Sequence, residues 1–458
     1  MLKIDWNLIK KYDKPGPRYT SYPPAPHFHD AFTHENFIEE IKRTNLDENA
    51  PDLSFYFHIP FCDTLCYFCG CNMITTRKRD RISRYIGYLK KEIDIVKTLI
   101  APHRKGVQLH WGGGTPTHLT PYEIANLAAY IHRSFDFKEN SEKSCEIDPR
   151  ELTKEHLSAL KSGGFNRISM GVQDFNKIVQ KAVNRIQSEK LTRKVVSWVR
   201  GLDFKSINLD LMYGLPFQTA KTFELTIDAI IDISPDRIAL FNFAYVPWMK
   251  KHQQLIDPKD LPASEEKLDT LKMVADKLSS AGYVFIGMDH FAKPDDELSI
   301  AIKEKKLYRN FQGYSTHAGT DIYAMGITGI SQFGRIYAQN QKEEKTYYQA
   351  LDRGILPILK GFNLRDDDIL RRDVIIRLMC NFELDFKLIE KKYNINFKEY
   401  FRWGLNNLDV MIDDDLLSID NDILKITQMG RLLVRNIAMN FDGYMEKEAD
   451  KGRYSRTV

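Results

Sequence analysis

The stretch HIPFCDTLCYFCGCNMI, residues 58–74, holds four of the chain's six cysteines within ten positions: Cys62, Cys66, Cys69 and Cys71. It overlaps the end of an aromatic and apolar run, LSFYFHIP (residues 53–60), that is typical of a buried β-strand. So many sulfurs on one short loop indicate a metal centre or redox chemistry at the end of that strand. The rest of the chain must then supply a sheet that carries this loop at its edge.

Further strand-like runs follow along the chain: residues 106–113, 143–149, 167–173, 206–216 and 237–245. Helical segments separate these runs: residues 81–100, 121–135, 154–164, 186–199 and 219–234. A helix from Ser264 to Ala281 and a strand-like run over residues 283–291 extend the series. Strand and helix alternate about six times, which predicts an α/β fold with a parallel sheet built from βα units.

The two ends of the chain differ in composition from the alternating strands and helices between them. The lead is rich in proline and tyrosine, and GPRYTSYPPAP, residues 16–26, is too dense in proline for a regular element. After Arg365 the segments become charged and helical, and residues 422–442 have the pattern of a strand, a turn and a helix. We therefore expect three parts: an N-terminal extension or lid over residues 1–50, an α/β domain over residues 51–360, and a mostly helical, winged-helix-like C-terminal domain over residues 361–458.

Composition limits the classes of protein to which the chain can belong. Its 458 residues are 43% hydrophobic, enough to bury the cores of two or three domains. Sixty-six basic and 62 acidic residues give a formal net charge of +4, too balanced for a nucleic-acid scaffold or a polybasic membrane anchor. The sequence has neither a signal-peptide core nor an apolar run long enough to span a membrane. We expect a cytoplasmic protein with no nucleic-acid partner, and in that reducing compartment clustered cysteines bind metal rather than form disulfides.

The spacing of the cysteines distinguishes several kinds of site. Zinc usually takes two C-x₂-C pairs, or one such pair with two histidines, and only Cys66 and Cys69 form such a pair. An electron-carrying ferredoxin site has the local spacing C-x₂-C-x₂-C, which this loop lacks. The spacing C-x₃-C-x₂-C of Cys62, Cys66 and Cys69 can hold three irons of a 4Fe–4S cubane and leave the fourth iron without a protein ligand. A structural or fortuitous cysteine cluster is the other alternative.

An open iron gives the loop a specific chemical use. It can chelate the amino and carboxylate groups of a methionine moiety, which brings the sulfonium of S-adenosylmethionine within electron-transfer range of the cluster. One electron then cleaves S-adenosylmethionine to methionine and a 5′-deoxyadenosyl radical. Tyr67 and Phe68, which lie between the cysteines, either shield the cluster from water or simply pack.

Motifs far from the cysteine loop support this interpretation. They are GPRYTSYP (16–23), HWGGGTPT (110–117), EIDPRE (146–151), GFNRISMGVQDF (164–175), NLDLMYGLP (208–216), GMDHFAKPDDEL (287–298) and NFQGYST (310–316). Together with the cysteine loop, these motifs resemble the oxygen-independent coproporphyrinogen III oxidases of the radical S-adenosylmethionine superfamily. The resemblance implies a partial (β/α)₆, TIM-like barrel with an N-terminal extension and a helical C-terminal domain.

The resemblance also implies a reaction and its partners. The family converts two propionate side chains of coproporphyrinogen III to vinyl groups by oxidative decarboxylation, which gives protoporphyrinogen IX in haem biosynthesis. The implied cofactors are a 4Fe–4S cluster and two S-adenosylmethionine molecules, and the implied partner is an electron donor such as a flavodoxin or a ferredoxin. A monomer is expected. One alternative is a haem-trafficking chaperone of the same superfamily, which the CGC element and the GPRYTSYP lead disfavour; another is a radical enzyme acting on RNA, which the small net charge disfavours.

Carried over residue by residue, the resemblance predicts the members of the site. The cluster ligands are Cys62, Cys66 and Cys69. The positions that match contacts to the cluster-bound S-adenosylmethionine are Tyr56, Gly113, Glu146 and Ile330. Those that match contacts to the second molecule are Phe68, Gly114, Thr115, Gln173, Arg185, Asp210 and Ala244. Tyr56, Gln312 and Arg18 are expected to serve catalysis, and Arg18 to meet the substrate propionates.

The other cysteines and one histidine have separate expectations. Cys71 is expected not to bind the same cubane, because it lies only two residues after Cys69 and the short loop would be strained. Cys145 and Cys380 are expected to be small buried apolar residues. His58 is expected either to hydrogen-bond the cluster region or to be a satisfied strand histidine.

Overall fold

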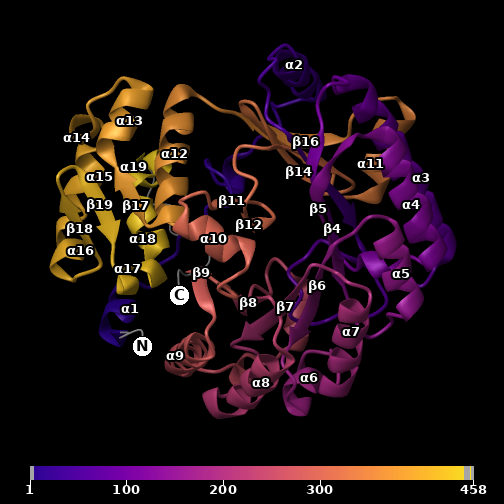
Figure 1. Ribbon diagram of the computed structural model, residues 1–458, viewed down its shortest axis with the longest axis horizontal. Helices are drawn as coiled ribbons and strands as arrows, with labels where there is room; N and C mark the ends of the chain where they lie inside the picture. The colour runs from indigo at the N-terminus through magenta and orange to yellow at the C-terminus, as the bar shows by residue number, and fades with distance from the viewer. Residues whose placement is uncertain (1–4, 448–453, 455–458) are drawn as a thin grey trace. The chain divides into compact units, whose positions relative to one another are not determined.

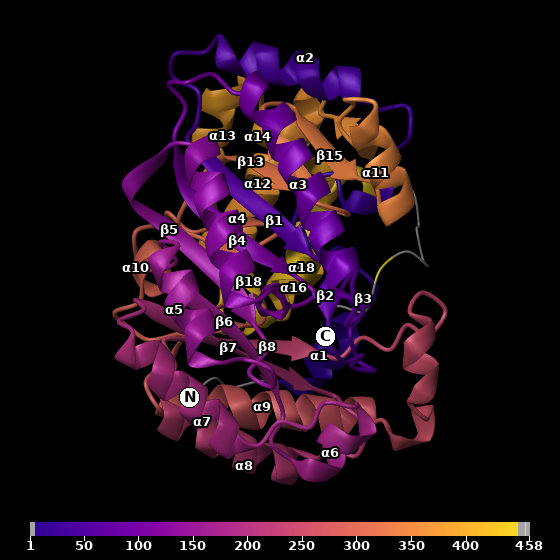
Figure 2. The ribbon, with the colours of Figure 1, turned by 90° about the vertical axis from the view of Figure 1, so that its right-hand side faces the viewer.

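The computed structural model describes residues 5–447 and residue 454, and the chain divides into two compact units. The barrel unit comprises Phe28–Thr270 and Gly319–Asn363. The terminal unit comprises the described parts of Met1–His27, Leu271–Ala318 and Leu364–Val458. Figure 1 and Figure 2 show the elements of both units. The expected division into residues 1–50, 51–360 and 361–458 stays a prediction.

The core of the barrel unit is the parallel sheet that the sequence predicts. Its strands are β1 (Leu53–Ile59), β4 (Gly106–Gly113), β5 (Phe137–Ile147), β6 (Arg167–Gln173), β7 (Ser206–Tyr213) and β8 (Arg237–Asn242). Each strand pairs in parallel with the next one in this order. The connecting helices are α3 (Arg79–Leu99), α4 (Pro121–Ser134), α5 (Lys154–Ser162), α6 (Lys177–Ala182), α7 (Glu189–Gly201) and α8 (Ala220–Ile233). The predicted βα series is confirmed, with a longer β5 and the additional helix α6.

A further parallel strand, β13 (Asp321–Met325), lies on the other side of β1 and was not expected. It pairs in parallel with β1 and is followed by an antiparallel series: β14 (Ile330–Phe333), β15 (Ile336–Asn340) and β16 (Ile358–Asn363). The strand order within this unit is β16-β15-β14-β13-β1-β4-β5-β6-β7-β8. The remaining helices of the unit are α2 (His34–Asn45), α9 (Ser264–Ser280), which begins in it, and α11 (Glu344–Asp352). The parallel part is the expected partial, TIM-like barrel.

The two faces of the parallel strands differ in polarity, and this difference positions the site. One face is apolar and at most 2% exposed: Phe55, Phe57, Leu109, Trp111, Ile168, Met170, Ile207, Leu209, Ile238 and Leu240. The helices surround the strands (Figure 1), so this face packs beneath them. The other face is polar, with Tyr56 opposite His110 across β1 and β4, and Glu146 opposite Ser169 across β5 and β6. The inside of the barrel is therefore lined by polar groups.

The terminal unit combines helices with a small antiparallel sheet. The sheet has the order β17 (Glu383–Asp385), β19 (Ile423–Ile426), β18 (Leu417–Asp420). The helices are α1 (Trp6–Tyr12), α10 (Glu297–Lys303), α12 (Asp366–Asn381), α13 (Phe386–Tyr393), α14 (Phe397–Tyr400), α15 (Arg402–Asn406), α16 (Asp409–Asp413), α17 (Gln428–Leu432), α18 (Val434–Ala438) and α19 (Gly443–Lys447). Two hairpins belong to the same unit: β9 (Val284–Gly287) with β10 (His290–Ala292), and β11 (Tyr308–Asn310) with β12 (Gly313–Ser315). The strand, turn and helix predicted over residues 422–442 are present as β19, α17 and α18.

The proline-rich lead is ordered by its contacts within the terminal unit. Of the residues 16–26 expected to lack a regular element, 16–24 form neither helix nor strand, but the short 3-10 helix η1 (Ala25–His27) begins at Ala25. Tyr19 is 1% exposed, and its hydroxyl donates to Asp442 at 2.9 Å. The amide of Gly443 donates to the Tyr22 hydroxyl at 3.0 Å, and Arg435 Nε donates to the Pro17 carbonyl at 3.0 Å. Within the described residues, no helix is both long and apolar enough to cross a membrane.

Candidate active site

The cysteine loop connects β1 to α3 and is closed by a short parallel pair, β2 (Phe61–Cys62) and β3 (Ile74–Thr75). The amide of Ile74 donates to the Pro60 carbonyl at 2.7 Å, and the amide of Thr76 donates to the Cys62 carbonyl at 3.0 Å. Inside the loop, the Cys69 amide donates to the Cys66 carbonyl at 3.1 Å. These bonds fold the loop at the carboxyl ends of the parallel strands, where barrel enzymes carry their active sites.

Segments that follow β6 hold the loop from a second side. Asn184 Nδ2 donates to the Leu65 carbonyl at 2.8 Å, and the Tyr67 amide donates to the Val183 carbonyl at 3.0 Å. Cys66 and Phe68 are buried in one apolar cluster whose other buried members are Val179, Val183, Leu215, Phe243 and Ile256. The loop is thus anchored through both its backbone and its side chains.

The cysteines differ in exposure. Cys66 is buried, Cys62 and Cys69 are partly exposed, and Cys71 is exposed. Within residues 5–447 and 454, no three side chains converge as ligands of one metal ion. A cubane attaches each cysteine to a different iron and so spreads its ligands more widely than a single zinc ion does. Cys145 and Cys380 are buried, as predicted.

Two arginines and one carboxylate surround the sulfur of Cys66. Arg150 Nη2 lies 3.4 Å and Arg185 Nη1 lies 3.7 Å from Cys66 Sγ. Both arginines also pair with Asp148, at 2.6 Å and 3.1 Å. Although burial opposes it, Arg185 and Arg150 hold the pKa of Asp148 down to about 2. The two guanidinium groups place positive charge beside the Cys66 sulfur.

The environments of the other two predicted ligands have opposite effects on their pKa values. A hydrogen bond from Cys71 lowers the pKa of Cys69 to about 7, against the effect of burial. Burial raises the pKa of Cys62 to about 12, although its sulfur lies 3.4 Å from the Thr115 hydroxyl oxygen. A metal bound at Cys62 must therefore displace a proton, which makes metal loading pH-dependent.

The glycine run after β4 packs directly against the cysteine loop and the carboxylate of β5. Gly113 has a φ of +119° and donates its amide to Glu146 Oε2 at 3.1 Å. The Gly114 amide donates to the Ile59 carbonyl at 2.9 Å. A Cβ on Gly112 would lie 2.9 Å from Glu146 Oε1, and one on Gly114 would lie 2.4 Å from the Pro60 oxygen. Only glycines allow this close approach.

Two carboxylates line the polar inside of the barrel. Glu146 Oε1 lies 3.3 Å from His110 Nε2, and this contact holds the pKa of Glu146 below its usual range although burial opposes it. Asp210 accepts from Asn208 Nδ2 at 2.7 Å and from the Ser169 hydroxyl at 3.3 Å. Burial and the charge of Glu146 raise the pKa of Asp210 to about 7. Glu146 is therefore ionised at neutral pH, whereas Asp210 keeps its proton to a much higher pH than an ordinary aspartate does.

The structure brings most of the predicted site residues to one edge of the sheet. His58 Nε2 donates to the Asn72 carbonyl at 2.9 Å, and His58 Nδ1 accepts from the Tyr56 hydroxyl at 3.0 Å, so this histidine is tied to the cysteine loop. Gln173 has a φ of +70°, and its side chain and that of Arg185 both approach Gly171. Phe68 lies in the apolar cluster with Cys66, the Thr115 hydroxyl lies beside Cys62, Ala244 follows β8, and Ile330 begins β14. Arg18 and Gln312 belong to the terminal unit.

A buried polar network behind the cysteine loop was not predicted. Glu92, which is 2% exposed, accepts from the Gly326 amide at 2.7 Å, from Asn340 Nδ2 at 2.6 Å and from the Tyr347 hydroxyl at 2.6 Å. The Tyr85 hydroxyl donates to the His58 carbonyl at 2.7 Å and accepts from the Ile327 amide at 3.1 Å. The network ties the end of β1 to the turn after β13. The sequence does carry a signal for this network, because Glu92 is a charged residue within the apolar stripe of α3.

Glu92→Gln is expected to remove a pH dependence of stability. Burial raises the pKa of Glu92 to about 7, so the folded chain binds this proton more tightly than the unfolded chain does. The wild-type free energy of unfolding should therefore fall by roughly 3 kcal/mol, relative to that of the variant, as the pH rises from about 5 to about 8. Urea unfolding of both proteins across this range measures the difference. Exposed Lys97→Gln on the same helix should keep the wild-type slope, and parallel curves for wild type and Glu92→Gln would contradict the prediction.

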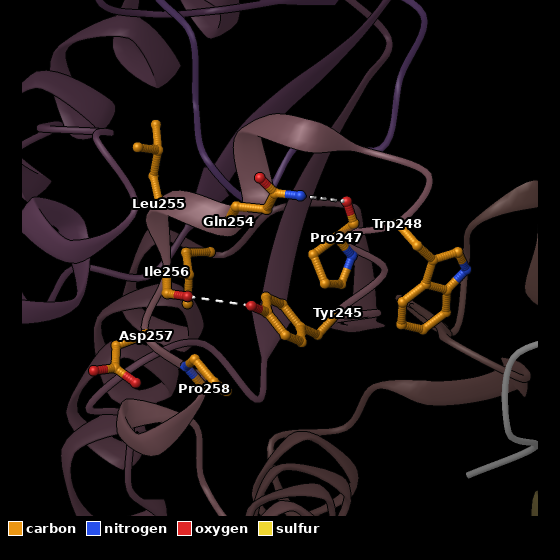
Figure 3. Close-up of a pocket in the computed structure, with 8 residues that line it drawn as sticks. All are labelled: Tyr245, Pro247, Trp248, Gln254, Leu255, Ile256, Asp257 and Pro258. Carbon is orange, nitrogen blue, oxygen red and sulfur yellow. Dashed lines mark hydrogen bonds between the residues drawn. The ribbon is translucent and has the colours of Figure 1, made fainter.

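The segment between β8 and α9 lies against the outer side of the cysteine loop. His252 Nε2 lies 2.7 Å from the Cys69 carbonyl oxygen, Lys250 Nζ donates to the Cys71 carbonyl at 3.0 Å, and Gln253 Nε2 donates to the Phe68 carbonyl at 3.2 Å. The same segment forms an open groove of about 640 Å³. Figure 3 shows its lining: Tyr245, Pro247, Trp248, Gln254, Leu255, Ile256, Asp257 and Pro258.

Two parts of the chain match described protein families. Residues 56–230 match the Radical SAM superfamily, and residues 364–433 match the HemN C-terminal domain. The first match contains the end of β1, the cysteine loop, the strands β4 to β7 and most of α8. The second lies within the terminal unit.

Full-length relatives agree with these matches. The chain is 46% identical over 98% of its length to the oxygen-independent coproporphyrinogen III oxidase of Synechocystis, 97% of which is covered. It is 45% identical over its whole length to the enzyme of the same name from Escherichia coli, 99% of which is covered. The solved structure of coproporphyrinogen III oxidase from Escherichia coli, described as a radical SAM enzyme, superposes with a TM-score of 0.92 at 44% identity, covering 96% of this chain and 99% of that one.

Proposed function

Because the chain belongs to the family of oxygen-independent coproporphyrinogen III oxidases, within the radical SAM superfamily, we propose that it converts coproporphyrinogen III to protoporphyrinogen IX. It is an oxidoreductase of haem biosynthesis that decarboxylates two propionate side chains to vinyl groups. The observation that carries this conclusion is the full-length similarity at 45% identity to the Escherichia coli enzyme. The relatives given above are named for this oxidation, and none of them for a haem carrier.

The residues of the cysteine loop fit a 4Fe–4S cluster. Cys62, Cys66 and Cys69 supply three thiols on one anchored loop, and Arg150 and Arg185 supply positive charge beside Cys66. When bound, the cluster supplies the electron that cleaves S-adenosylmethionine to the deoxyadenosyl radical, which removes a hydrogen atom from a propionate. Phe68 and its apolar neighbours exclude water from the inner side of the loop. We propose that Cys71, which is exposed, does not bind the cluster.

Tyr56, Gly113, Glu146 and Ile330 are proposed to contact the S-adenosylmethionine at the cluster. The ionised Glu146 carboxylate faces the inside of the barrel beside the glycine run and can accept from the ligand's ammonium group. Its present partner, the Gly113 amide, belongs to the same proposed set. Tyr56 lies between His58 and His110, at ring-centroid distances of 6.0 Å and 5.8 Å, and can pack against the ligand.

A second S-adenosylmethionine is proposed to contact Phe68, Gly114, Thr115, Gln173, Arg185, Asp210 and Ala244. Two atoms in this set support a ligand: Arg185 Nε and Gln173 Oε1 are buried and have no hydrogen-bond partner. An unpartnered buried donor or acceptor is costly, and a bound polar molecule would satisfy both atoms. Arg185 would meet the ligand's carboxylate, and Asp210 its hydroxyl or amino groups.

Arg18 and Gln312, which belong to the terminal unit, are proposed to serve catalysis together with Tyr56, and Arg18 to meet the substrate propionates. Arg18 pairs with Asp289, and its own carbonyl accepts from Arg309 Nε at 3.4 Å. The buried atoms Arg309 Nη1 and Gln312 Nε2 have no hydrogen-bond partner. The Arg18 guanidinium, Arg309 Nη1 and Gln312 Nε2 are donors, and the substrate is a tetracarboxylate whose propionates can accept from them.

Arg18→Gln is expected to raise the KM for coproporphyrinogen III by roughly tenfold or more, because a charge-assisted hydrogen bond contributes about 1.5–3 kcal/mol. Formation of 5′-deoxyadenosine without substrate should not change. The matched control is Arg402→Gln, an exposed arginine of the same unit. An unchanged KM, or an equal loss of deoxyadenosine formation, would show that Arg18 does not serve the substrate. Anaerobic steady-state kinetics with dithionite as reductant make both measurements.

The proposed function is tested by an anaerobic assay of the reconstituted protein. Coproporphyrinogen III, S-adenosylmethionine, a reductant and an electron acceptor are supplied, and protoporphyrinogen IX and 5′-deoxyadenosine are quantified together. We expect both products. If 5′-deoxyadenosine forms without any change in the tetrapyrrole, the radical chemistry is supported, but coproporphyrinogen III is not the substrate. We also propose that the enzyme is monomeric and cytoplasmic, and that a flavodoxin or a ferredoxin reduces it.

A further inference from the structure

An exposed apolar and basic surface lies directly outside the cysteine loop. On the segment between β8 and α9, Trp248 is 75% exposed, Met249 is 72% exposed and Leu255 is 62% exposed. Trp248 and Met249 are consecutive in the chain, and exposed apolar patches are typical of interaction sites. Figure 3 shows Trp248 at the outer end of the groove, apart from the other side chains that line it.

The surface is joined to the cysteine loop by hydrogen bonds. Lys250 and His252, which follow Trp248 and Met249 in the chain, contact the carbonyl oxygens of Cys71 and Cys69 at 3.0 Å and 2.7 Å. Gly70 and Cys71 are themselves exposed, and no heavy atom lies within 4 Å of the position that a Cβ on Gly70 would take. The predicted ligand Cys69 is itself partly exposed, so the loop that carries it reaches solvent beside this surface.

The charge of this surface is positive beside the exposed aromatic residue. Trp248 and Met249 are followed by Lys250 and the exposed Lys251, and no acidic residue occurs between Tyr245 and Ile256. The acids of the segment are Asp257 and Asp260 at its far end, and Asp257 caps the following turn through the Lys259 amide at 3.0 Å. A partner with an acidic face around an exposed redox group would complement this arrangement.

We propose that Trp248, Met249, Lys250 and Lys251 form the docking surface for a small acidic one-electron carrier protein. The proposal rests on the proposed function, which requires an external electron for each S-adenosylmethionine that is cleaved. The carrier is oxidised by one electron, and the cluster held by the three cysteines is reduced by that electron. Electron-transfer partners bind through small interfaces with charge complementarity, so a patch of this extent suffices.

The experiment uses the full-length, cluster-loaded protein and reduced flavodoxin as the probe. Lys251→Glu and Trp248→Ser alter exposed side chains for which the structure shows no role in the site itself. The matched control is Lys345→Glu, an exposed lysine on α11 of the same unit. Stopped-flow spectroscopy follows the loss of cluster absorption after mixing with reduced flavodoxin, and a titration at low and high salt gives the Kd.

Both variants are expected to slow cluster reduction by flavodoxin by roughly tenfold or more at low salt, with a matching rise in Kd for Lys251→Glu. Reduction by dithionite should keep its wild-type rate, and Lys345→Glu should behave as wild type in every measurement. Unchanged reduction by flavodoxin in both variants would overturn the proposal. A raised KM for coproporphyrinogen III with dithionite as reductant would overturn it as well, because the surface would then serve the substrate. Failure of the proposed function would appear differently, as wild-type protein that is reduced but forms no protoporphyrinogen IX.

Discussion

Cys66→Ser is expected to abolish 5′-deoxyadenosine formation and decarboxylation together. Cys66 is the buried member of the three-cysteine loop, and the guanidinium groups of Arg150 and Arg185 lie 3.4 Å and 3.7 Å from its sulfur. A serine hydroxyl keeps its proton at neutral pH and is a poor ligand for iron, so the cluster would lose one of its three protein ligands. Since changes to groups that merely support metal ligands cost up to about a hundredfold, loss of a ligand should cost more.

The measurement combines iron content, visible absorption of the reconstituted protein and both reaction products. Two other cysteines provide controls. Cys71→Ser is expected to retain the cluster absorption, because Cys71 is exposed and is not proposed as a ligand. Cys380→Ala removes a buried thiol of α12 in the terminal unit and should leave both the cluster and the products in place. A Cys66→Ser protein that still cleaves S-adenosylmethionine would refute the assignment of the ligands.

Local patterns predicted β1 and β4 to β8 well and β13 to β16 poorly. The strands β1 and β4 to β8 are bounded by helices of ordinary length, so the alternation of strand and helix marks them in the sequence. β13 is five residues long and buried throughout, and without an alternating pattern its sequence is indistinguishable from a short loop or helix. β14 to β16 follow it with glycine turns, which is why the glycine-rich character of this region hid its strands.

The site divides in a similar way between local and long-range information. The spacing of Cys62, Cys66 and Cys69 is a local signal, and it indicates a cluster without reference to any other part of the chain. The pairing of Asp148 with Arg150 and Arg185 beside Cys66 joins residues that are 84 and 119 positions away from that cysteine. Such contacts depend on which strands become neighbours, and local sequence patterns do not specify them.

Gly114→Ala is expected to damage the cysteine loop severely although it removes no reactive group. An alanine Cβ would lie 2.4 Å from the Pro60 oxygen, 2.6 Å from the Pro60 carbonyl carbon and 2.9 Å from the Phe61 oxygen. These are backbone atoms that directly precede Cys62, so no flexible side chain can yield to the added methyl group. Overpacking of this kind costs about 1–3 kcal/mol, and the strand-to-loop junction must move to relieve it.

Because Gly114 also donates its amide to the Ile59 carbonyl at 2.9 Å, that movement would carry the cysteine loop with it. A displacement of about 1 Å near reacting groups can lower a rate by roughly a hundredfold, so Gly114→Ala should lose iron, stability and product formation together. Gly70→Ala is the matched control, since it adds the same methyl group within the cysteine loop where no atom lies within 4 Å. It should change the free energy of unfolding by less than about 0.5 kcal/mol and retain the cluster. Equal damage from both substitutions would mean that the loop tolerates no added volume anywhere, and the contact with Pro60 would then not be the cause.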